Sequence, residues 1–355
     1  MHSDNHAFFW KKKEFISFVL SILVFFIHSY FAQDNGDNSF VAVLNHKVSY
    51  FFSCSITRFA VPMFFILSGI TFFKDYSNKE YAKKIKRRLF TLVIPYLLWN
   101  TVWMLWEIFT SHSFLAKFSA SEPFPLTLSN IVKGIFFYGC NVPFWFIFDI
   151  ILFSLAAPLV FLIIRNKYVG IFVVSGLTIA SLWGVYMPAD LFYYPMSAIF
   201  YLIGAIIGYH FFDRASRKSS KPLQIASVVF LSAYILVKNI VPSELHIDNY
   251  FTQTLVYTLA AFCLWNTADM FIERIKDRAI YKRSFAIYAM HLNIAIIILK
   301  IASLCLPQNP WLEIPKFAAT VVLTLAVINT FCVLCEKYLP SIYGVLMGSR
   351  INKRP

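Results

Sequence analysis

The stretch Phe15–Phe31, FISFVLSILVFFIHSYF, is an apolar run of helical length that contains one histidine, His28. An α-helix of about 20 apolar residues spans the hydrocarbon core of a bilayer. Apolar stretches of similar length recur along all 355 residues, of which 59% are hydrophobic and 14% are charged. Soluble domains contain about 25% charged residues. The sequence therefore predicts an all-α protein, a polytopic bundle of transmembrane helices.

About ten spans are expected from the positions of these stretches. They cover residues 15–33, 50–73, 89–110, 143–164, 169–187, 192–212, 222–241, 250–272, 283–305 and 313–337. We expect no appended soluble domain, so residues 1–355 are interpreted as a single transmembrane domain. The longest connection, Ser111–Val142, is rich in aromatic residues, and we expect it to fold back on the outer face as a lid over a substrate.

The placement of Lys and Arg gives the orientation, because these residues accumulate on the cytoplasmic side of a membrane. Alternate connections are basic: Lys11–Lys13, Lys83–Arg88, Arg165 with Lys167, Arg214–Lys221, Arg274–Arg283 and the C-terminal NKRP. Both termini are then cytoplasmic, residues 1–13 and 338–355 included. This topology explains the net charge of +14 and argues against nucleic-acid binding, which needs a basic stripe on a soluble surface.

Several ionisable residues lie within the expected spans, where an Arg at mid-span costs about 2.5–3.5 kcal/mol. At a rise of about 1.5 Å per residue, His28 lies about 7 Å, Arg58 about 12 Å and Asp149 about 9 Å below the outer boundary. Glu107 lies near the outer end of the third span, and His291 is nearer the middle of the ninth. Intramembrane charges generally face a cavity, so we expect a polar pocket open to the outer face. A simpler interpretation is that Arg58 and Asp149 form a buried ion pair.

The types of these residues suggest acyl transfer to a hydroxyl group. Histidine takes and returns a proton near neutral pH, which fits His28 as a general base. Arg58 is able to stabilise an oxyanion, and Asp149 is able to orient the imidazole. No metal-ligand spacing surrounds His28, so no metal is expected.

Four further stretches carry a family resemblance. They are RFAVPMFFILSGITFF (Arg58–Phe73), LVIPYLLWN (Leu92–Asn100), PFWFIFD (Pro143–Asp149) and SFAIYAMHLNI (Ser284–Ile294). Together with the histidine late in the first span, they resemble the membrane acyltransferase-3 family nearly from end to end. The resemblance implies an O-acyltransferase of the bacterial inner membrane, usually an O-acetyltransferase, that acts on cell-surface or periplasmic glycans.

The resemblance also implies roles for individual residues. His28 matches the catalytic histidine of the family, and Arg58 matches its second-span arginine. The acyl donor is expected to be cytoplasmic acetyl-CoA, and the acceptor a glycan or a lipid-linked saccharide. The remaining substrate-side candidates are Asp149, Glu107, His291 and Trp145, whose ring is expected to stack on a sugar.

The basic segment KKIKRR (Lys83–Arg88) is expected to attract the phosphates of CoA as well as to set the topology. Lys84, Arg87 and Arg88 are the candidates for this contact. Many family members have Arg-x-x-Arg at the head of the third span, whereas here Arg87 is followed three residues later by Phe90. Two other family arginines are replaced by Ser17 and Phe148.

Two other classes of protein remain open from the sequence. In a transporter or a flippase of lipid-linked sugars, the same buried charges would line a substrate path. The chain lacks the internal repeats and the paired broken helices that are typical of such proteins. A catalytically inactive relative that scaffolds glycan assembly would keep the fold without the chemistry.

Overall fold

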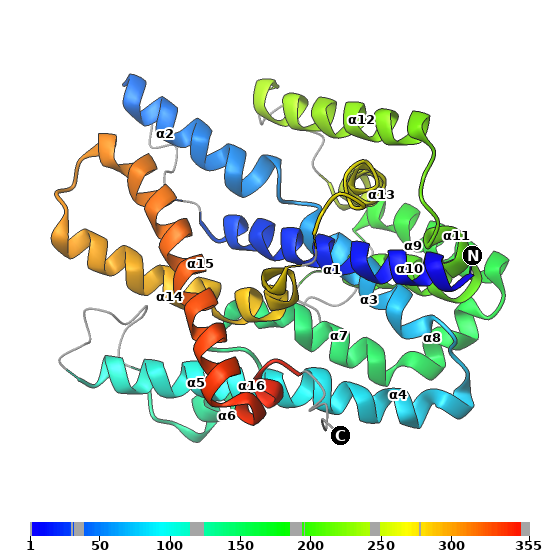
Figure 1. Ribbon diagram of the computed structural model, residues 1–355, viewed down its shortest axis with the longest axis horizontal. Coiled ribbons are helices and arrows are strands. Elements are labelled where there is room, and N and C mark those ends of the chain that lie inside the picture. Colours follow the sequence, from blue (N-terminus) through cyan, green and yellow to red (C-terminus); the bar gives the residue numbers. More distant parts are fainter. Residues whose placement is uncertain are drawn as a thin grey trace. The chain divides into compact units, whose positions relative to one another are not determined.

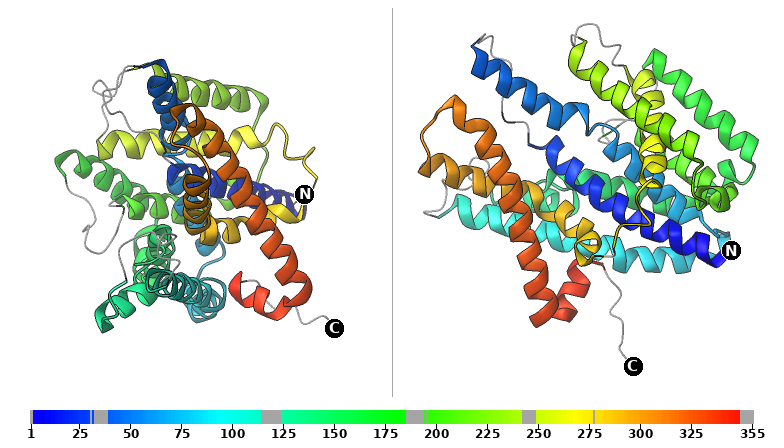
Figure 2. Two further views of the ribbon diagram at one scale, coloured as in Figure 1. Left: turned by 90° about the vertical axis from the view of Figure 1, so that its left-hand side faces the viewer. Right: turned by 45° about the horizontal axis from the view of Figure 1, so that its top comes forward.

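The protein is helical throughout the part that the computed structural model describes, where only helices and connecting segments occur (Figures 1 and 2). This confirms the all-α prediction. The structure describes residues 2–29, 31, 39–113, 124–184, 194, 196–241, 249–276 and 278–348.

The chain divides into two compact units. The first contains residues 1–24, 53–85 and 152–284, and the second contains residues 25–52, 86–151 and 285–355. The helices α1 (His2–Ile27) and α7 (Trp145–Leu155) contribute residues to both.

The length and the apolar composition of several helices indicate an integral membrane protein. Five described helical segments are long and apolar enough to cross a bilayer: Phe40–Phe73, Asn78–Ser111, Lys221–Ile240, Ala279–Cys305 and Pro310–Tyr338. A sixth results if the pair Val142–Leu155 and Ala157–Ile164, bent by 69°, is counted as one span. The apolar helices Lys167–Trp183 and Ser197–His210 are shorter. The count of ten spans and the cytoplasmic position of both termini stay predictions.

Glycines hold two helices of unit 1 in close contact. Gly69 is on α3 (Ala60–Phe73), and Gly204 and Gly208 are four residues apart on α10 (Ser197–His210), a spacing that lets helix backbones approach each other in membranes. A Cβ atom on Gly204 would collide with the Ile66 carbonyl oxygen, and one on Gly208 with that of Ile70. The two helices pack backbone to backbone along this line, which requires glycine.

Two further helices of unit 1 begin at side-chain caps that the sequence provides. The Asn166 side chain accepts hydrogen bonds from the Tyr168 and Val169 amides at the start of α9 (Lys167–Ala180). Asn249 and Thr252 form a capping box at the start of α13 (Tyr250–Ala268). The other members are α8 (Ala157–Ile164), α11 (Phe212–Ala215) and α12 (Lys221–Ile240), which packs against α13.

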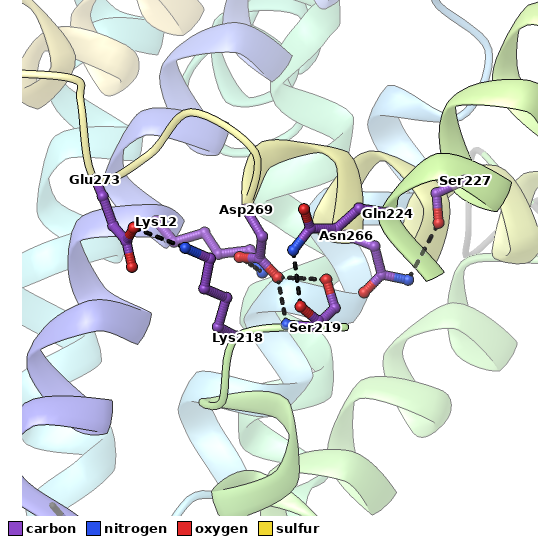
Figure 3. Close-up of polar contacts among 8 residues, drawn as sticks. All are labelled: Lys12, Lys218, Ser219, Gln224, Ser227, Asn266, Asp269 and Glu273. Carbon is purple, nitrogen blue, oxygen red and sulfur yellow. Dashed lines mark hydrogen bonds and ion pairs between the residues drawn. The ribbon is translucent and has the colours of Figure 1, made fainter. Parts of the chain in front are cut away.

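A buried ion pair anchors the first half of α1 in unit 1 (Figure 3). The Lys12 Nζ lies 2.6 Å from the Asp269 Oδ1, both side chains are fully buried, and the ammonium sits 4.1 Å from the ring centre of Trp265. Asp269 also accepts hydrogen bonds from the backbone amide of Ser219, at 2.9 Å, and from its hydroxyl, at 2.7 Å. The pair therefore joins α1, the end of α13 and the connection before α12.

The chain around this pair adds weaker contacts (Figure 3). The Gln224 amide donates to the Ser219 carbonyl at 2.7 Å, which holds the connection in place. Lys218 pairs with Glu273 at 2.6 Å, but both of these side chains are exposed. An exposed pair contributes little to stability, so the Lys12–Asp269 pair is the main electrostatic contact here.

Unit 2 contains a helix that the sequence analysis treated as part of an outer connection. In α6 (Leu128–Phe136), the Phe136 carbonyl accepts from the Tyr96 hydroxyl at 2.8 Å, and the Ile135 carbonyl from the Asn100 amide at 3.1 Å. Both donors belong to α5 (Ile94–Ser111), and Gly134 packs against Met104 one turn further along it. The second part of the connection thus returns alongside α5. Residues 114–123 lie outside the described residues, and the role of the connection as a lid stays a prediction.

The last helices of unit 2 close against α5. After α14 (Ser284–Cys305), α15 (Glu313–Tyr338) meets α16 (Pro340–Leu346) at a sharp turn (Figure 2). The Trp99 indole on α5 donates to the Leu346 carbonyl at 3.1 Å. At the other side of the unit, Asn45 on α2 (Phe40–Tyr50) donates to the Pro310 carbonyl at 2.8 Å.

The contact between α3 and α10 predicts a position-specific effect of adding one methyl group. Gly204→Ala should lower the free energy of unfolding by at least about 1–3 kcal/mol, because the new Cβ meets backbone atoms that have no room to move. Gly176→Ala on α9 is the control, since a Cβ there has nothing within 4 Å. Thermal unfolding of the purified protein in detergent measures both. Equal midpoints for the two variants would contradict this packing.

The buried ion pair predicts that Lys12, but not the neighbouring Lys11, is needed for the stability of the protein. Lys12→Met should lower the free energy of unfolding by about 3–5 kcal/mol, because it leaves the Asp269 carboxylate buried without its cation. Lys11→Met, one residue away and partly exposed, is the matched control and should have little effect. Unfolding of both variants in detergent tests this. A Lys12→Met protein as stable as the control would show that Asp269 does not depend on the lysine.

Candidate functional site

Two histidines expected in separate spans meet in unit 2. His28 directly follows the last residue of α1, where its backbone amide bonds to the Phe25 carbonyl at 3.1 Å, and its side chain is half-buried. His291 lies on α14 and is completely buried. The centres of the two imidazole rings are 5.5 Å apart, and Phe25 packs against His291 at 5.6 Å. The sequence singled out both residues but did not predict that they are neighbours.

The hydrogen bonds of His291 define which of its ring nitrogens accepts a proton. Its Nδ1 lies 3.0 Å from the Ile287 carbonyl oxygen and 2.9 Å from that of Tyr288. Carbonyl oxygens accept hydrogen bonds, so Nδ1 carries the proton and Nε2 has the free lone pair of a neutral ring. Among the described residues, this buried Nε2 has no hydrogen-bond partner. It is therefore an acceptor next to His28.

The helix that bears His291 is fixed from two sides. Its Tyr288 hydroxyl donates to the Pro143 carbonyl just before α7, and its ring stacks on Phe144 at 6.0 Å. The Trp103 indole, on α5, donates to the Ala289 carbonyl at 2.9 Å. These contacts hold α14 in register with α5 and with the start of α7.

Asp149 joins the same group of side chains. It lies on α7, is 1% exposed, and interacts electrostatically with Tyr288. Tyr288 was not identified from the sequence as a site residue. Its signal was the spacing, because residues three apart on a helix share a face, which places Tyr288 beside His291 in the stretch SFAIYAMHLNI.

Two other substrate-side candidates lie in unit 2 with distinct surroundings. Glu107 is half-buried on α5, close to Cys140, and burial together with the Glu107 carboxylate raises the pKa of the Cys140 thiol to about 11. Trp145, the first residue of α7, is 9% exposed and packs edge-on against Phe146 at 6.3 Å. Its stacking on a sugar stays a prediction.

Arg58 lies in unit 1, in the turn before α3, and is exposed. Its guanidinium donates to the Cys54 sulfur at 3.1 Å. The partnership of Arg58 with His28, and its alternative ion pair with Asp149, both connect residues of different units and stay predictions.

The basic segment divides into residues with different contacts. The Lys84 ammonium donates to the carbonyls of Phe72 and Lys74, at 2.7 Å each, and so caps the end of α3. Arg87 and Arg88 lie in the last turn of α4 (Tyr81–Arg88), and Arg87 is exposed. Lys84 thus has a structural role that the sequence did not predict, while the contact of these residues with a donor stays a prediction.

Phe148 belongs to an aromatic cluster. Its ring centre lies 6.4 Å from that of Tyr96, 5.7 Å from that of Phe137 and 5.8 Å from that of Tyr138. Rings packed in this way fill the space that a charged side chain would need.

A comparison with protein-family models matches residues 16–332 to the acyltransferase domain of the acyltransferase-3 family. The chain belongs to this family. The match covers both histidines, Asp149 and nearly all of the described helices, and it confirms the resemblance found in the sequence. A search of curated proteins and a search of solved structures each gave no match.

The Tyr288 hydroxyl predicts a stability effect at this site. Tyr288→Phe should lower the free energy of unfolding by about 1–3 kcal/mol, because the buried Pro143 carbonyl loses its donor. Tyr281→Phe is the control, since the contacts of Tyr281 are made by its ring, with Phe15 and Phe18. Denaturation in detergent measures both variants. If they lose the same stability, the hydrogen bond to Pro143 contributes nothing.

Proposed function

We propose that this member of the acyltransferase-3 family is an O-acyltransferase of the bacterial inner membrane. It moves an acetyl or another short acyl group from cytoplasmic acyl-CoA to a hydroxyl of a cell-surface or periplasmic glycan. The observation that carries the proposal is the contact between His28 and His291 inside the region that matches the family. A pair of imidazoles in a largely apolar surrounding suits proton transfer.

In the proposed reaction, His28 takes the proton from the acceptor hydroxyl as its oxygen attacks the thioester carbonyl. A carbon–oxygen bond forms, the carbon–sulfur bond breaks, and the proton passes from His28 to the departing CoA thiolate. General-base assistance of this kind contributes about 10²–10⁴-fold to a rate. Arg58, the family's second-span arginine, is proposed to stabilise the negative charge on the carbonyl oxygen.

His291 is proposed to act through His28. Its neutral ring offers Nε2 as an acceptor, which favours the orientation of His28 or of the acceptor hydroxyl in which a proton points toward His291. Tyr288 and Asp149 hold this arrangement. His291 is thus a positioning residue, and its complete burial fits a group that does not exchange with solvent.

The test is acetyl transfer by the purified protein in proteoliposomes, with labelled acetyl-CoA on one side and glycan acceptor on the other. His28→Ala should lower transfer by about 10²–10⁴-fold while CoA binding stays intact. His46→Ala, at a half-buried histidine on α2, is the control. Undiminished transfer by His28→Ala would contradict the mechanism. Movement of a saccharide across the membrane without any acylated product would indicate a transporter instead.

A further inference from the structure

Unit 1 contains a polar pocket that the proposed chemistry does not use. Its volume is about 670 Å³, within the range of about 300–1,000 Å³ that is typical of ligand sites. It is formed by His6 on α1, by Lys74 and Asp75 directly after α3, and by residues 208–214 and 217 at the end of α10, in α11 and directly after α11. All these residues belong to unit 1.

Three segments that are distant in the sequence line the pocket. Their basic residues predict that all three lie on the cytoplasmic side of the membrane. The segment before the first span, the connection after α3 and the connection after α10 are each basic and expected to be cytoplasmic. The fold brings these three segments together. The pocket therefore opens on the side where the predicted topology places acyl-CoA.

Two of the basic residues in the pocket, Lys74 and His6, already lie next to acidic side chains. Lys74 lies 3.7 Å from the Asp75 carboxylate and 4.6 Å from the ring centre of Phe212, and the His6 imidazole lies 3.6 Å from the Asp213 carboxylate. Both acidic groups thus have a cationic or titratable neighbour.

Arg214 and Arg217 are exposed, and in the described part of the chain neither guanidinium forms a hydrogen bond or an ion pair. Guanidinium groups bind phosphate oxygens in bidentate fashion. These two arginines are therefore the groups of the pocket that remain for an anionic ligand.

The lining of the pocket also includes aromatic residues. Tyr209 and Phe211 line the pocket, and each is 36% exposed. An exposed ring next to phosphate-binding cations is the combination that holds a nucleotide, because the base stacks while the phosphates pair with arginine. A simple inorganic anion would use the cations alone.

We propose that this pocket binds an organic phosphate, namely the phosphorylated adenosine end of the acyl-CoA donor, through Arg214, Arg217 and the rings of Tyr209 and Phe211. This rests on the proposed function for the identity of the donor. It assigns to the donor a site formed by α1, α3, α10 and α11, apart from the KKIKRR segment that the sequence suggested.

The test measures equilibrium binding of adenosine 3′,5′-bisphosphate and of CoA to the detergent-purified, full-length protein. Arg214→Gln/Arg217→Gln should weaken both by at least about tenfold, since two charge-assisted contacts are lost, and should raise the KM for acyl-CoA more than it lowers kcat. Arg165→Gln/Lys167→Gln removes the same charge from another basic connection of unit 1, outside the pocket, and should bind like the parent. Melting midpoints of both variants are measured alongside.

Each outcome decides the proposal. Unchanged binding of both nucleotides by Arg214→Gln/Arg217→Gln would overturn it. Retention of added phosphatidylglycerol by the parent but not by this variant, at equal nucleotide affinity, would assign the pocket to lipid headgroups and also overturn it. Failure of the proposed function can be told apart from failure of the pocket proposal. Nucleotide binding that depends on the two arginines, in a protein without acyl transfer, would support the pocket and reject the proposed function. Transfer that depends on His28 but not on the arginines would retain the function and reject the pocket.

Discussion

A polar or charged side chain that is removed from water must be paired, and this constraint explains the arrangement of α1. At Lys12, the ammonium is buried against the Asp269 carboxylate and the Trp265 ring, which fixes the first half of the helix in unit 1. At its other end the helix gives way to His28, whose ring lies beside His291 in unit 2. The same helix thus carries a paired charge at one end and the proposed base at the other.

Polar contacts to backbone carbonyls fix the other elements of the candidate site. Tyr288, Trp103 and His291 each donate to a carbonyl oxygen of unit 2, so the α14 segment around His291 has little freedom to rotate. A neutral imidazole held in this way keeps one defined acceptor atom. Such preorganisation matters for a base, because a proton is transferred only between groups in a fixed geometry.

The sequence predicted what depends on local composition and missed what depends on distant partners. The all-α fold followed from apolar stretches of bilayer length, and the candidates His28, His291 and Asp149 from being ionisable within them. Lys11, Lys12 and Lys13 look alike in the sequence, yet Lys12 is the one whose ammonium pairs with Asp269. The path of α6 was also missed, since its nine residues are too few to signal a crossing and its partners Tyr96 and Asn100 lie on α5. Lys84 was assigned to the donor from charge alone, whereas the carbonyls that it caps are a feature of the folded α3.

The central claim is that His28 makes this family member an O-acyltransferase of a cell-surface or periplasmic glycan. The most direct measurement is the mass of that glycan from cells that express the intact chain and from cells that express a His28→Asn form at the same level. The account predicts that glycan repeats from cells with the intact chain are heavier by one acetyl or other short acyl group, and that this difference disappears in the His28→Asn cells. Acylated glycan in both kinds of cell, or in neither, would contradict it.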